Sequence, residues 1–380
     1  MKTLVGVQRC ADYDPDRVED ALNALIERAG GWPETVGPGT KVLVKPNLLL
    51  PTPPERAVTT HPAVLRAVLK SLQQTGAEVS VGEQPGLLHL PQIQQCFDKT
   101  GTKQVCEELG VPWAVFSERG YRQVEVPDGR QADTLHIAKD ILAADFVVSL
   151  AKAKTHLQSM FTGAVKNMFG TIPGKDRKRL HILAKYELFS ESLVDILAAS
   201  KPSFAVMDGV VGMAGKGPSE GEITPMGFLV AGADAVAVDR VTSTLMGYRK
   251  LNIHHLKHAQ ERGLGIHDLE QIQINGADLK RDALKLKPPP TLYKSMPSFF
   301  YRLGYSLISV QPRIDPELCR ECRICAESCP AECISFDNGP HIDYSRCIEC
   351  FCCHELCPHG AVKEKLGPLR KVERIFRRGS

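Results

Sequence analysis

Two cysteine runs near the carboxyl end of the chain constrain its fold more than any other feature of the sequence. The first run is Cys319-x2-Cys322-x2-Cys325-x3-Cys329-Pro330. The second begins 28 residues later and repeats the spacing as Cys347-x2-Cys350-x2-Cys353-x3-Cys357-Pro358. Ten of the 13 cysteines lie in residues 319–357, whereas a secreted disulfide scaffold would spread its cysteines through a small domain. The clustering therefore indicates metal ligation.

The spacing of both runs resembles that of bacterial ferredoxins with two 4Fe-4S clusters, in which the fourth cysteine of each run binds the other cluster. The resemblance covers about residues 314–362. It implies one cluster held by Cys319, Cys322, Cys325 and Cys357, and a second held by Cys347, Cys350, Cys353 and Cys329. Zinc, the alternative for paired C-x2-C motifs, uses neither the third cysteine nor the repeated Cys-Pro. Cys333 and Cys352 are left over, either as buried apolar residues or as neighbours that tune a cluster.

The composition of the 380 residues is that of a globular chain, with 43% apolar and 24% charged residues. A formal charge of +3 argues against binding of nucleic acid by the whole chain. No apolar stretch approaches the roughly 20 residues of a transmembrane helix. The first residues lack the cleavage pattern of a secretory signal, so we expect a cytoplasmic protein.

Alternating strands and helices are predicted for residues 1–275. Asp14-Pro15 is expected to begin a helix that ends near Arg28, and His61-Pro62 one that ends near Gln73. Strands are expected at Leu4–Gln8, Lys41–Val44, Val79–Gly82, Phe146–Leu150 and Phe204–Asp208, and a helix around Leu193, Ile196 and Leu197. This order predicts an α/β fold with a mostly parallel sheet and helices on both faces, followed by a small α+β two-cluster ferredoxin-like domain.

Four segments follow from these patterns: an α/β domain at 1–279, a linker at 280–313, the ferredoxin-like domain at 314–362 and a basic tail at 363–380. The linker contains three consecutive prolines and the aromatic run Phe299–Tyr301, so it is expected to pack on another surface. Residues 315–357 carry a net charge of −6 and residues 358–380 one of +5, which fits docking of a redox partner protein. Helical spacing of apolar tail residues fits a solvated helix better than a weak contact with a membrane surface; these residues are Leu369, Val372, Ile375 and Phe376.

Polar residues are expected to follow four of the strands and to meet at the carboxyl edge of the sheet, where ligands of open α/β sheets bind. They are Lys45 and Asn47, Glu83, the run Lys152–His156, and Asp208. The stretch 151–181 has a net charge of +6 and contains Gly163, Gly170 and Gly174, which would allow close approach of the backbone to an anion. Residues 175–179 fit a solvated basic loop equally well.

Four of these segments also resemble the family known as domain of unknown function 362, which is often joined to ferredoxin modules. They are VLVKPNLL at 42–49, TTHP at 59–62, AKAKTH at 151–156 and TGAVKNMFGTIPG at 162–174. The resemblance covers roughly residues 1–245. The sequence departs from the family pattern in one turn, VGEQPG at 81–86, where Glu83 stands in place of the usual Asp.

Three hypotheses for function follow, the first being a ferredoxin-type oxidoreductase whose clusters exchange electrons with an anionic ligand. Its substrate-binding residues would be Lys45, Asn47, Lys152, Lys154, Lys166 and Asn167. His61 or His156 would exchange protons, because imidazole titrates nearest to neutral pH. The second hypothesis is a non-catalytic electron-transfer or docking subunit, and the third a protein of metal or cluster maturation.

Two weaker features complete the predictions. The glycine-rich segment 215–221 fits neither the dinucleotide fingerprint nor a Walker loop, so we expect a mobile loop over the site. His254 and His258 have the spacing of zinc ligands on a helix. No third ligand stands at a suitable spacing, and a surface helix explains this pair better.

Overall fold

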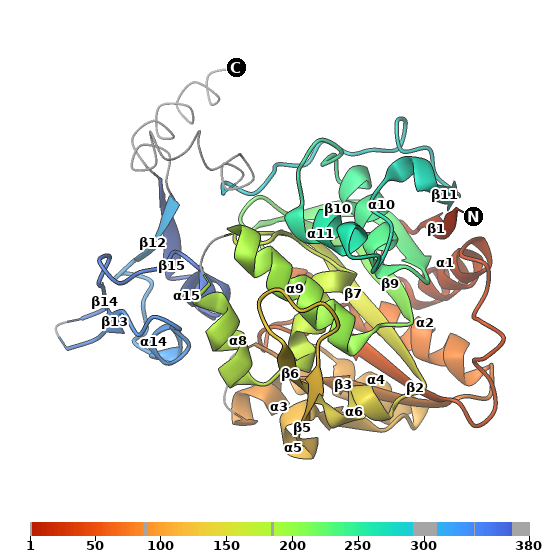
Figure 1. Ribbon diagram of the computed structural model, residues 1–380, viewed down its shortest axis with the longest axis horizontal. Coiled ribbons are helices and arrows are strands. Elements are labelled where there is room, and N and C mark those ends of the chain that lie inside the picture. Colours follow the sequence, from red (N-terminus) through yellow and green to blue (C-terminus); the bar gives the residue numbers. More distant parts are fainter. Residues whose placement is uncertain (1, 87–89, 184–185, 292–309, 338, 367–380) are drawn as a thin grey trace.

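One large sheet forms the centre of the molecule. The computed structural model describes residues 2–86, 90–183, 186–291, 310–337 and 339–366. Among these residues nine strands form one sheet, and most of its neighbouring strands run parallel (Figure 1). Its order is β11 (Ile272–Asn275), β1 (Thr3–Arg9), β10 (Glu222–Gly232), β9 (Phe204–Ala214), β7 (Phe146–His156), β2 (Lys41–Pro46), β3 (Glu78–Glu83) and β4 (Trp113–Val115), with β8 (Met160–Thr162) beside β7. Antiparallel contacts join β1 to β10, β10 to β9 and β7 to β8. The predicted α/β class is confirmed.

Helices cover both faces of the sheet. In β2, Val42 and Val44 enter the core formed with α1 (Pro15–Arg28) and α2 (Pro62–Gln73). Leu43, between them, enters the core formed with α9 (Tyr186–Ser200). Further along the sheet the second face is covered by α10 (Ala235–Leu245) and α11 (His254–Glu261). Successive residues of a strand point to opposite faces, so a sheet covered on both faces buries both sets.

The predicted beginnings of two helices are confirmed. The Asp14 side chain accepts a hydrogen bond from the backbone N–H of Arg17 at 3.1 Å, and Pro15 is the first residue of α1. His61 caps α2 in the same way, because its Nδ1 accepts from the backbone N–H of Ala63 at 3.2 Å. Each cap satisfies an N–H group that has no partner inside its helix.

Shorter elements occupy the connections. They are 3-10 turns at Pro54–Arg56, Met168–Thr171 and Leu269–Gln271; the hairpin of β5 (Tyr121–Glu125) and β6 (Thr134–Ala138); and helices α3 (Leu90–Lys99), α4 (Thr102–Leu109), α5 (Phe116–Arg119), α6 (Lys139–Ala143), α7 (Ala164–Asn167) and α8 (Gly174–His181). Helix α8 contains the basic run 175–179, for which a solvated loop was the alternative.

Strands β7 and β9 are longer than predicted, and this changes the position of the basic residues. Lys152, Lys154 and His156 lie inside β7 rather than beyond its end. The chain turns back after His156, and β8 pairs with the end of β7. In the same way β10 pairs with β9 as far as Ala214, so Asp208 lies within a strand. The prediction was wrong because these pairings come from residues further along the chain.

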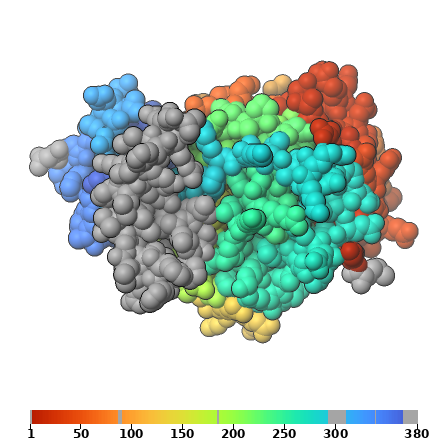
Figure 2. Space-filling model, turned by 90° about the horizontal axis from the view of Figure 1, so that it is seen from above, coloured from red at the N-terminus to blue at the C-terminus, as the bar shows by residue number. Residues whose placement is uncertain are grey.

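The C-terminal part, residues 310–366, lies beside the α/β part near α8 (Figure 1). Its antiparallel pairs are β12 (Val310–Ile314) with β15 (Val362–Leu366), and β13 (Ile334–Ser335) with β14 (His341–Ile342); its short helices are α14 (Ile324–Glu327) and α15 (Cys352–Glu355). This is the expected small α+β region. Residues 310–313, predicted as linker, and 363–366, predicted as tail, belong to the β12–β15 pair. Viewed from above, the blue residues occupy one end of the molecule (Figure 2).

The two parts meet through apolar and polar contacts. Leu49, Val58 and Met213 of the α/β part pack with Leu356 of the C-terminal part. The segment 215–221, predicted to be a mobile loop, contributes polar contacts at this junction, one of them between Glu220 and Lys363 at 3.5 Å. Ser219 Oγ donates to the His354 carbonyl at 3.4 Å, and Lys216 pairs with Glu364. The segment therefore connects the two parts.

Two predicted features lie outside the described residues. These are the aromatic run Phe299–Tyr301 of the linker and the apolar tail positions Leu369, Val372, Ile375 and Phe376. Within the described part of the chain, none of the helices has both the length and the apolar character needed to cross a membrane.

The cap of α1 gives a test of the fold. We expect Asp14→Ala to lower the free energy of unfolding by about 1 kcal/mol, because the Arg17 N–H loses its acceptor. Urea unfolding followed by fluorescence measures this, since both tryptophans, Trp32 and Trp113, lie in the α/β part. The control is Asp20→Ala, an exposed position of the same helix, which should change the value by less than about 0.5 kcal/mol. Equal effects of the two substitutions would contradict the capping role.

Candidate functional site

A polar cavity lies at the junction of the two parts. Its volume is about 60 Å³, enough for a small ion with a few waters. Strands β2, β3 and β7, helix α8 and the C-terminal helix α15 all contribute to its wall. We call it the junction cavity. Its charged and imidazole side chains are Lys45, Glu83, Lys154, His156, Lys166, Arg177, His181 and Glu355.

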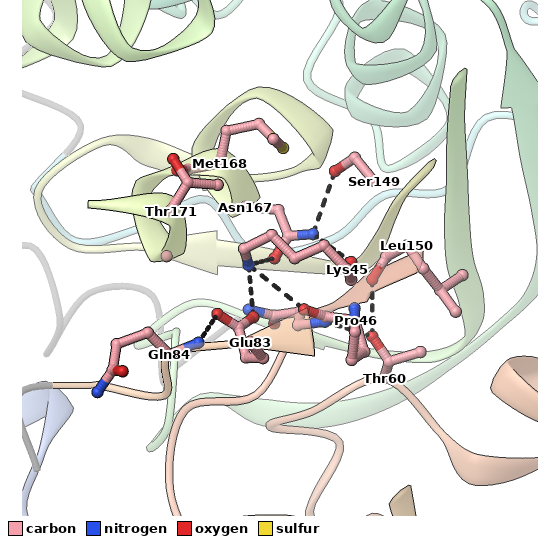
Figure 3. A network of polar contacts seen from close by, with 12 residues as sticks. Lys45, Pro46, Thr60, Glu83, Gln84, Ser149, Leu150, Asn167, Met168 and Thr171 are labelled. Atoms are coloured by element: carbon pink, nitrogen blue, oxygen red, sulfur yellow. Dashed lines mark hydrogen bonds and ion pairs between the residues drawn. The ribbon is translucent and has the colours of Figure 1, made fainter. Parts of the chain in front are cut away.

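Lys45, Glu83 and Asn167 form a buried network on one wall (Figure 3). Lys45 Nζ pairs with the Glu83 carboxylate and donates to Asn167 Oδ1 at 3.1 Å. Asn167 Nδ2 in turn donates to the Lys45 carbonyl at 3.0 Å and to Ser149 Oγ at 3.1 Å. Burial lowers the pKa of Lys45 to about 8, although Glu83 opposes this shift. Glu83, the departure from the family pattern, is the counter-ion of a buried lysine.

Gly170 makes room for this pair. A Cβ atom at Gly170 would lie 2.3 Å from Glu83 Oε1 and 2.6 Å from Lys45 Nζ. At Gly163 a Cβ atom would lie 2.2 Å from Asp239 Oδ1. Two of the three glycines expected to admit an anion therefore make room for charged side chains of the protein itself.

Lys154 and Lys166 bring further positive charge to the cavity. Lys154 Nζ donates to the Val58 carbonyl, and burial lowers the pKa of Lys154 to about 7. Burial also lowers the pKa of Lys166, with Glu355 opposing the shift. The Lys166 Nζ lies 5.2 Å from the centre of the Phe169 ring, a weakly favourable contact for a cation.

His156 connects the basic strand to the C-terminal part. Its Nδ1 accepts the backbone N–H groups of Gln158 at 3.0 Å and Ser159 at 3.2 Å, so the neutral ring carries its proton on Nε2. Nε2 lies 3.4 Å from Glu355 Oε2. Burial lowers the pKa of His156 to about 4. Burial disfavours the charged form of Glu355, but Lys166 and His156 hold the pKa of this carboxyl below its ordinary value.

Arg177 and His181 of α8 also line the cavity, and neither was predicted as a site residue. The Arg177 guanidinium is buried and donates to four backbone carbonyls, those of Gln84, Gly86, Gly170 and Ile172. His181 Nδ1 lies 2.8 Å from Gln158 Oε1. A solvated loop was the alternative prediction for residues 175–179. Of these, Asp176 and Arg177 are buried, whereas Lys175 is exposed.

Several buried polar atoms of the cavity wall have no hydrogen-bond partner among the described residues. They include Asn47 Oδ1, Thr162 Oγ1 and His156 Nε2. Buried polar atoms are nearly always satisfied by protein, water or ligand. The cavity therefore offers both hydrogen-bond acceptors and hydrogen-bond donors to a polar ligand.

Lys152 and His61 belong to a different network, outside the junction cavity. Lys152 Nζ donates to Asp208 Oδ2 at 2.8 Å and to the Tyr13 hydroxyl at 2.6 Å. The His61 ring stacks on Tyr13 with centroids 3.5 Å apart, and its backbone N–H donates to Asp208 Oδ2 at 2.9 Å. A register shift in the pairing of β7 with β9 between Lys152 and Lys154 separates these two lysines. The predicted residues therefore divide into two networks.

The cysteines of the two runs line two small cavities of about 10 Å³ each. The cysteines of the first cavity are Cys319, Cys322, Cys325 and Cys357. Those of the second are Cys329, Cys347, Cys350 and Cys353, together with Cys333 and Cys352. Each cavity therefore combines three cysteines of one run with the fourth of the other, an arrangement whose thiolate donors suit iron–sulfur clusters.

The two runs share one backbone conformation. Positive φ angles occur at Glu321 and Arg323 of the first run, and again at Glu349 and Phe351, each 28 residues later. Left-handed conformations of non-glycine residues are strained, and they persist where the surrounding structure requires them. Their recurrence at equivalent positions shows that the backbone folds alike in both runs.

The Lys45–Glu83 pair gives a test of the site. Lys45→Met should lower the free energy of unfolding by about 3–5 kcal/mol, because the Glu83 carboxylate stays buried without its counter-ion. Adding Glu83→Gln should recover part of this loss. Arg66→Ala, which breaks the exposed pair with Glu108, is the control and should cost less than about 1 kcal/mol in the same denaturation assay. The assignment is wrong if the double variant is no more stable than Lys45→Met.

Comparisons with known proteins identify two families along the chain. A family model described as domain of unknown function (DUF362) matches residues 42–244, and one described as 4Fe-4S binding domain matches residues 312–335. The thylakoid-associated protein sll1697 of Synechocystis sp. is 32% identical over 264 residues, which are 69% of this chain and 80% of that protein.

Two solved structures are similar to part of this chain. The lactate racemase apoprotein from Thermoanaerobacterium thermosaccharolyticum has a TM-score of 0.42 at 16% identity, over 61% of this chain and 54% of that one. A protein from Thermotoga maritima has a TM-score of 0.36 at 15% identity, over 56% and 53%. This chain thus spans about half of each. The predicted fusion is confirmed by the family models: the chain belongs to the DUF362 family, and its C-terminal part contains a 4Fe-4S binding domain.

Proposed function

We propose that the protein is an iron–sulfur oxidoreductase that exchanges electrons with a small anionic ligand in the junction cavity. It would hold two 4Fe-4S clusters. One would be bound by Cys319, Cys322, Cys325 and Cys357, and the other by Cys329, Cys347, Cys350 and Cys353. When bound, such clusters exchange single electrons with a partner or a substrate.

The proposal of two clusters extends the family match, which covers the first run only. It is supported by the repeated spacing and by the recurrence of left-handed residues 28 positions apart. It is also supported by the cysteines that line each of the two small cavities. Cys333 and Cys352 would be neighbours of the second cluster, since both line its cavity beside the four proposed ligands.

The position of Cys352 is the observation that carries the redox assignment. Cys352 lines both the second cysteine cavity and the junction cavity. It begins helix α15, which also contains Cys353 and ends at Glu355, whose carboxylate faces His156. One short helix therefore separates the proposed second cluster from the proposed ligand, a suitable arrangement for direct electron transfer.

The electrostatics of the junction cavity favour an anion. Four cationic side chains line it against two carboxylates, and one of these, Glu83, is already paired with Lys45. Lys154 and Lys166 would bind the anion, while Asn47 and Asn167 orient it. His156 would donate a hydrogen bond to the anion from Nε2, because its Nδ1 is held as an acceptor. With its pKa lowered to about 4 by burial, the ring stays neutral and keeps this proton. We assign no ligand contact to Lys152 or His61, which lie in the Tyr13–Asp208 network.

We further propose that the electrons come from a redox partner protein in the cytoplasm. The net charge of −6 over residues 315–357 supports docking of a basic partner. The relative from Synechocystis sp. is named for its association with thylakoids, so contact with a membrane-bound redox partner fits the same proposal.

Cluster content can be tested with one pair of variants. Protein purified without oxygen should contain about eight iron and eight sulfide per chain by native mass spectrometry. Cys353→Ser should reduce the iron content to about half, because it removes a proposed ligand of the second cluster only. Cys352→Ser, the neighbouring cysteine that is not a proposed ligand, should retain the full content. Zinc in place of iron, or iron loss in Cys352→Ser alone, would contradict the ligand assignment.

Binding of sulfate tests the anion site, since sulfate keeps its charge between pH 6 and pH 9. Lys154→Met should weaken sulfate binding to the cluster-loaded protein by about 10- to 100-fold in calorimetry. The control is Lys175→Met, an exposed lysine of the same basic stretch, which should bind as the wild type does. If Lys154→Met binds sulfate normally, the cavity is not the anion site, and a non-catalytic electron carrier becomes the better interpretation.

The same titration should depend on pH. The pKa of Lys154 is lowered to about 7 by burial, so its ammonium is present below pH 7 and is lost as the pH rises. Charges of Glu355, Lys166 and Lys152 act on it, and Lys45, with a pKa of about 8, loses its charge somewhat later. Sulfate affinity should therefore fall between pH 6 and pH 8.5. Lys154→Arg should reduce this dependence, because a guanidinium stays protonated.

A further inference from the structure

A group of three potential metal ligands lies apart from the cysteines and from the junction cavity. Glu187, His254 and His258 each offer a ligand atom, and these atoms lie within 4.8 Å of one another. Glu187 is in the first turn of α9, whereas both histidines are on α11. The two helices pack side by side (Figure 1). Sequence spacing could not pair the histidines with Glu187, because the third ligand is 67 residues earlier in the chain.

His258 has the geometry of a histidine prepared to bind a metal. Its Nδ1 lies 3.1 Å from Glu261 Oε2. Its Nε2 is buried and has no hydrogen-bond partner among the described residues. Metal-binding histidines usually donate one ring N–H to a carboxylate, which leaves the other nitrogen as the ligand. Glu261 is thus a positioning residue that presents Nε2 of His258.

The packing of α9 against α11 holds the other histidine in place. The Tyr186 hydroxyl accepts the backbone N–H of His254 at 3.4 Å and donates to the Asn252 carbonyl at 3.3 Å. The rings of Tyr186 and His254 have centroids 4.6 Å apart. His254 and His258 share one face of α11 because they are four residues apart. The site is therefore built on two helices whose contact is fixed by a neighbouring tyrosine.

We propose that Glu187, His254 and His258 bind a zinc ion at the contact of α9 and α11. Two imidazoles and one carboxylate suit Zn²⁺, whereas Mg²⁺ and Ca²⁺ prefer oxygen ligands. Ligand atoms bound to tetrahedral zinc lie about 3.3 Å apart, so small side-chain rotations bring the three groups to the ion. Three protein ligands leave a fourth position for water or for an exogenous ligand.

Zinc binding should be measured on the full chain after its cysteines have been loaded with iron and sulfide without oxygen. We expect about one zinc per chain beyond the iron content. X-ray absorption at the zinc edge should show nitrogen or oxygen neighbours at about 2.0–2.2 Å, without the sulfur shell near 2.3 Å that cysteine-bound zinc would give. A sulfur shell, or the absence of bound zinc, overturns the proposal.

Variants identify the ligands and the positioning residue. Titration against a zinc chelator should give an affinity at least 100-fold lower for His258→Ala, and about 10- to 100-fold lower for Glu261→Ala. Glu261→Gln, which keeps an acceptor for Nδ1, should recover part of the loss. His341→Ala, an exposed histidine of the C-terminal part, is the control and should bind normally. If His258→Ala retains the wild-type affinity while folded by circular dichroism, these residues do not form a zinc site.

Discussion

Removal of cationic side chains from water is the constraint on which the rest of this structure depends. Within the described chain, Lys45, Lys152, Lys154, Lys166 and Arg177 are all nearly inaccessible to solvent. A buried charge costs several kcal/mol unless it is paired and hydrogen-bonded. The carboxylates of Glu83 and Asp208, backbone carbonyls and, across the junction, Glu355 supply this compensation. Burial of these charges therefore accounts for Gly170, where a Cβ atom would lie 2.6 Å from Lys45 Nζ, and it places Glu355 of the C-terminal part beside Lys166.

Local sequence signals predicted those parts of the fold that depend on local chemistry. Asp14 and His61 mark helix starts because each side chain satisfies an N–H group two or three residues away. The apolar runs marked the first residues of β7 and β9 but not their ends. These ends depend on pairing with β8 and β10, which follow later in the chain. Signals within a few residues could not reveal such pairings.

The candidate site was predicted in part for the same reason. Lys45, Lys154, His156, Lys166 and both asparagines line one cavity, although Lys154 and His156 lie within β7 and Lys166 and Asn167 lie on α7. The division of Lys152 from Lys154 follows from a register shift that no residue pattern announces. Glu355 was missed because its partner His156 is distant in sequence. Two of the four carbonyls that Arg177 binds, those of Gln84 and Gly86, are distant as well. A signal for Arg177 did exist, since it lies seven residues after Gly170, whose carbonyl it binds.

Helix α15 has a consequence for how the molecule matures. It spans only Cys352–Glu355, and four residues cannot hold a helical turn unaided. If Cys353 binds the second cluster as proposed, it fixes this helix to the cluster. The helix also contributes Cys352 and Glu355 to the wall of the junction cavity. A chain that has not yet received its iron would then lack one wall of the junction cavity. The anion could therefore bind only after the clusters that supply its electrons had been assembled.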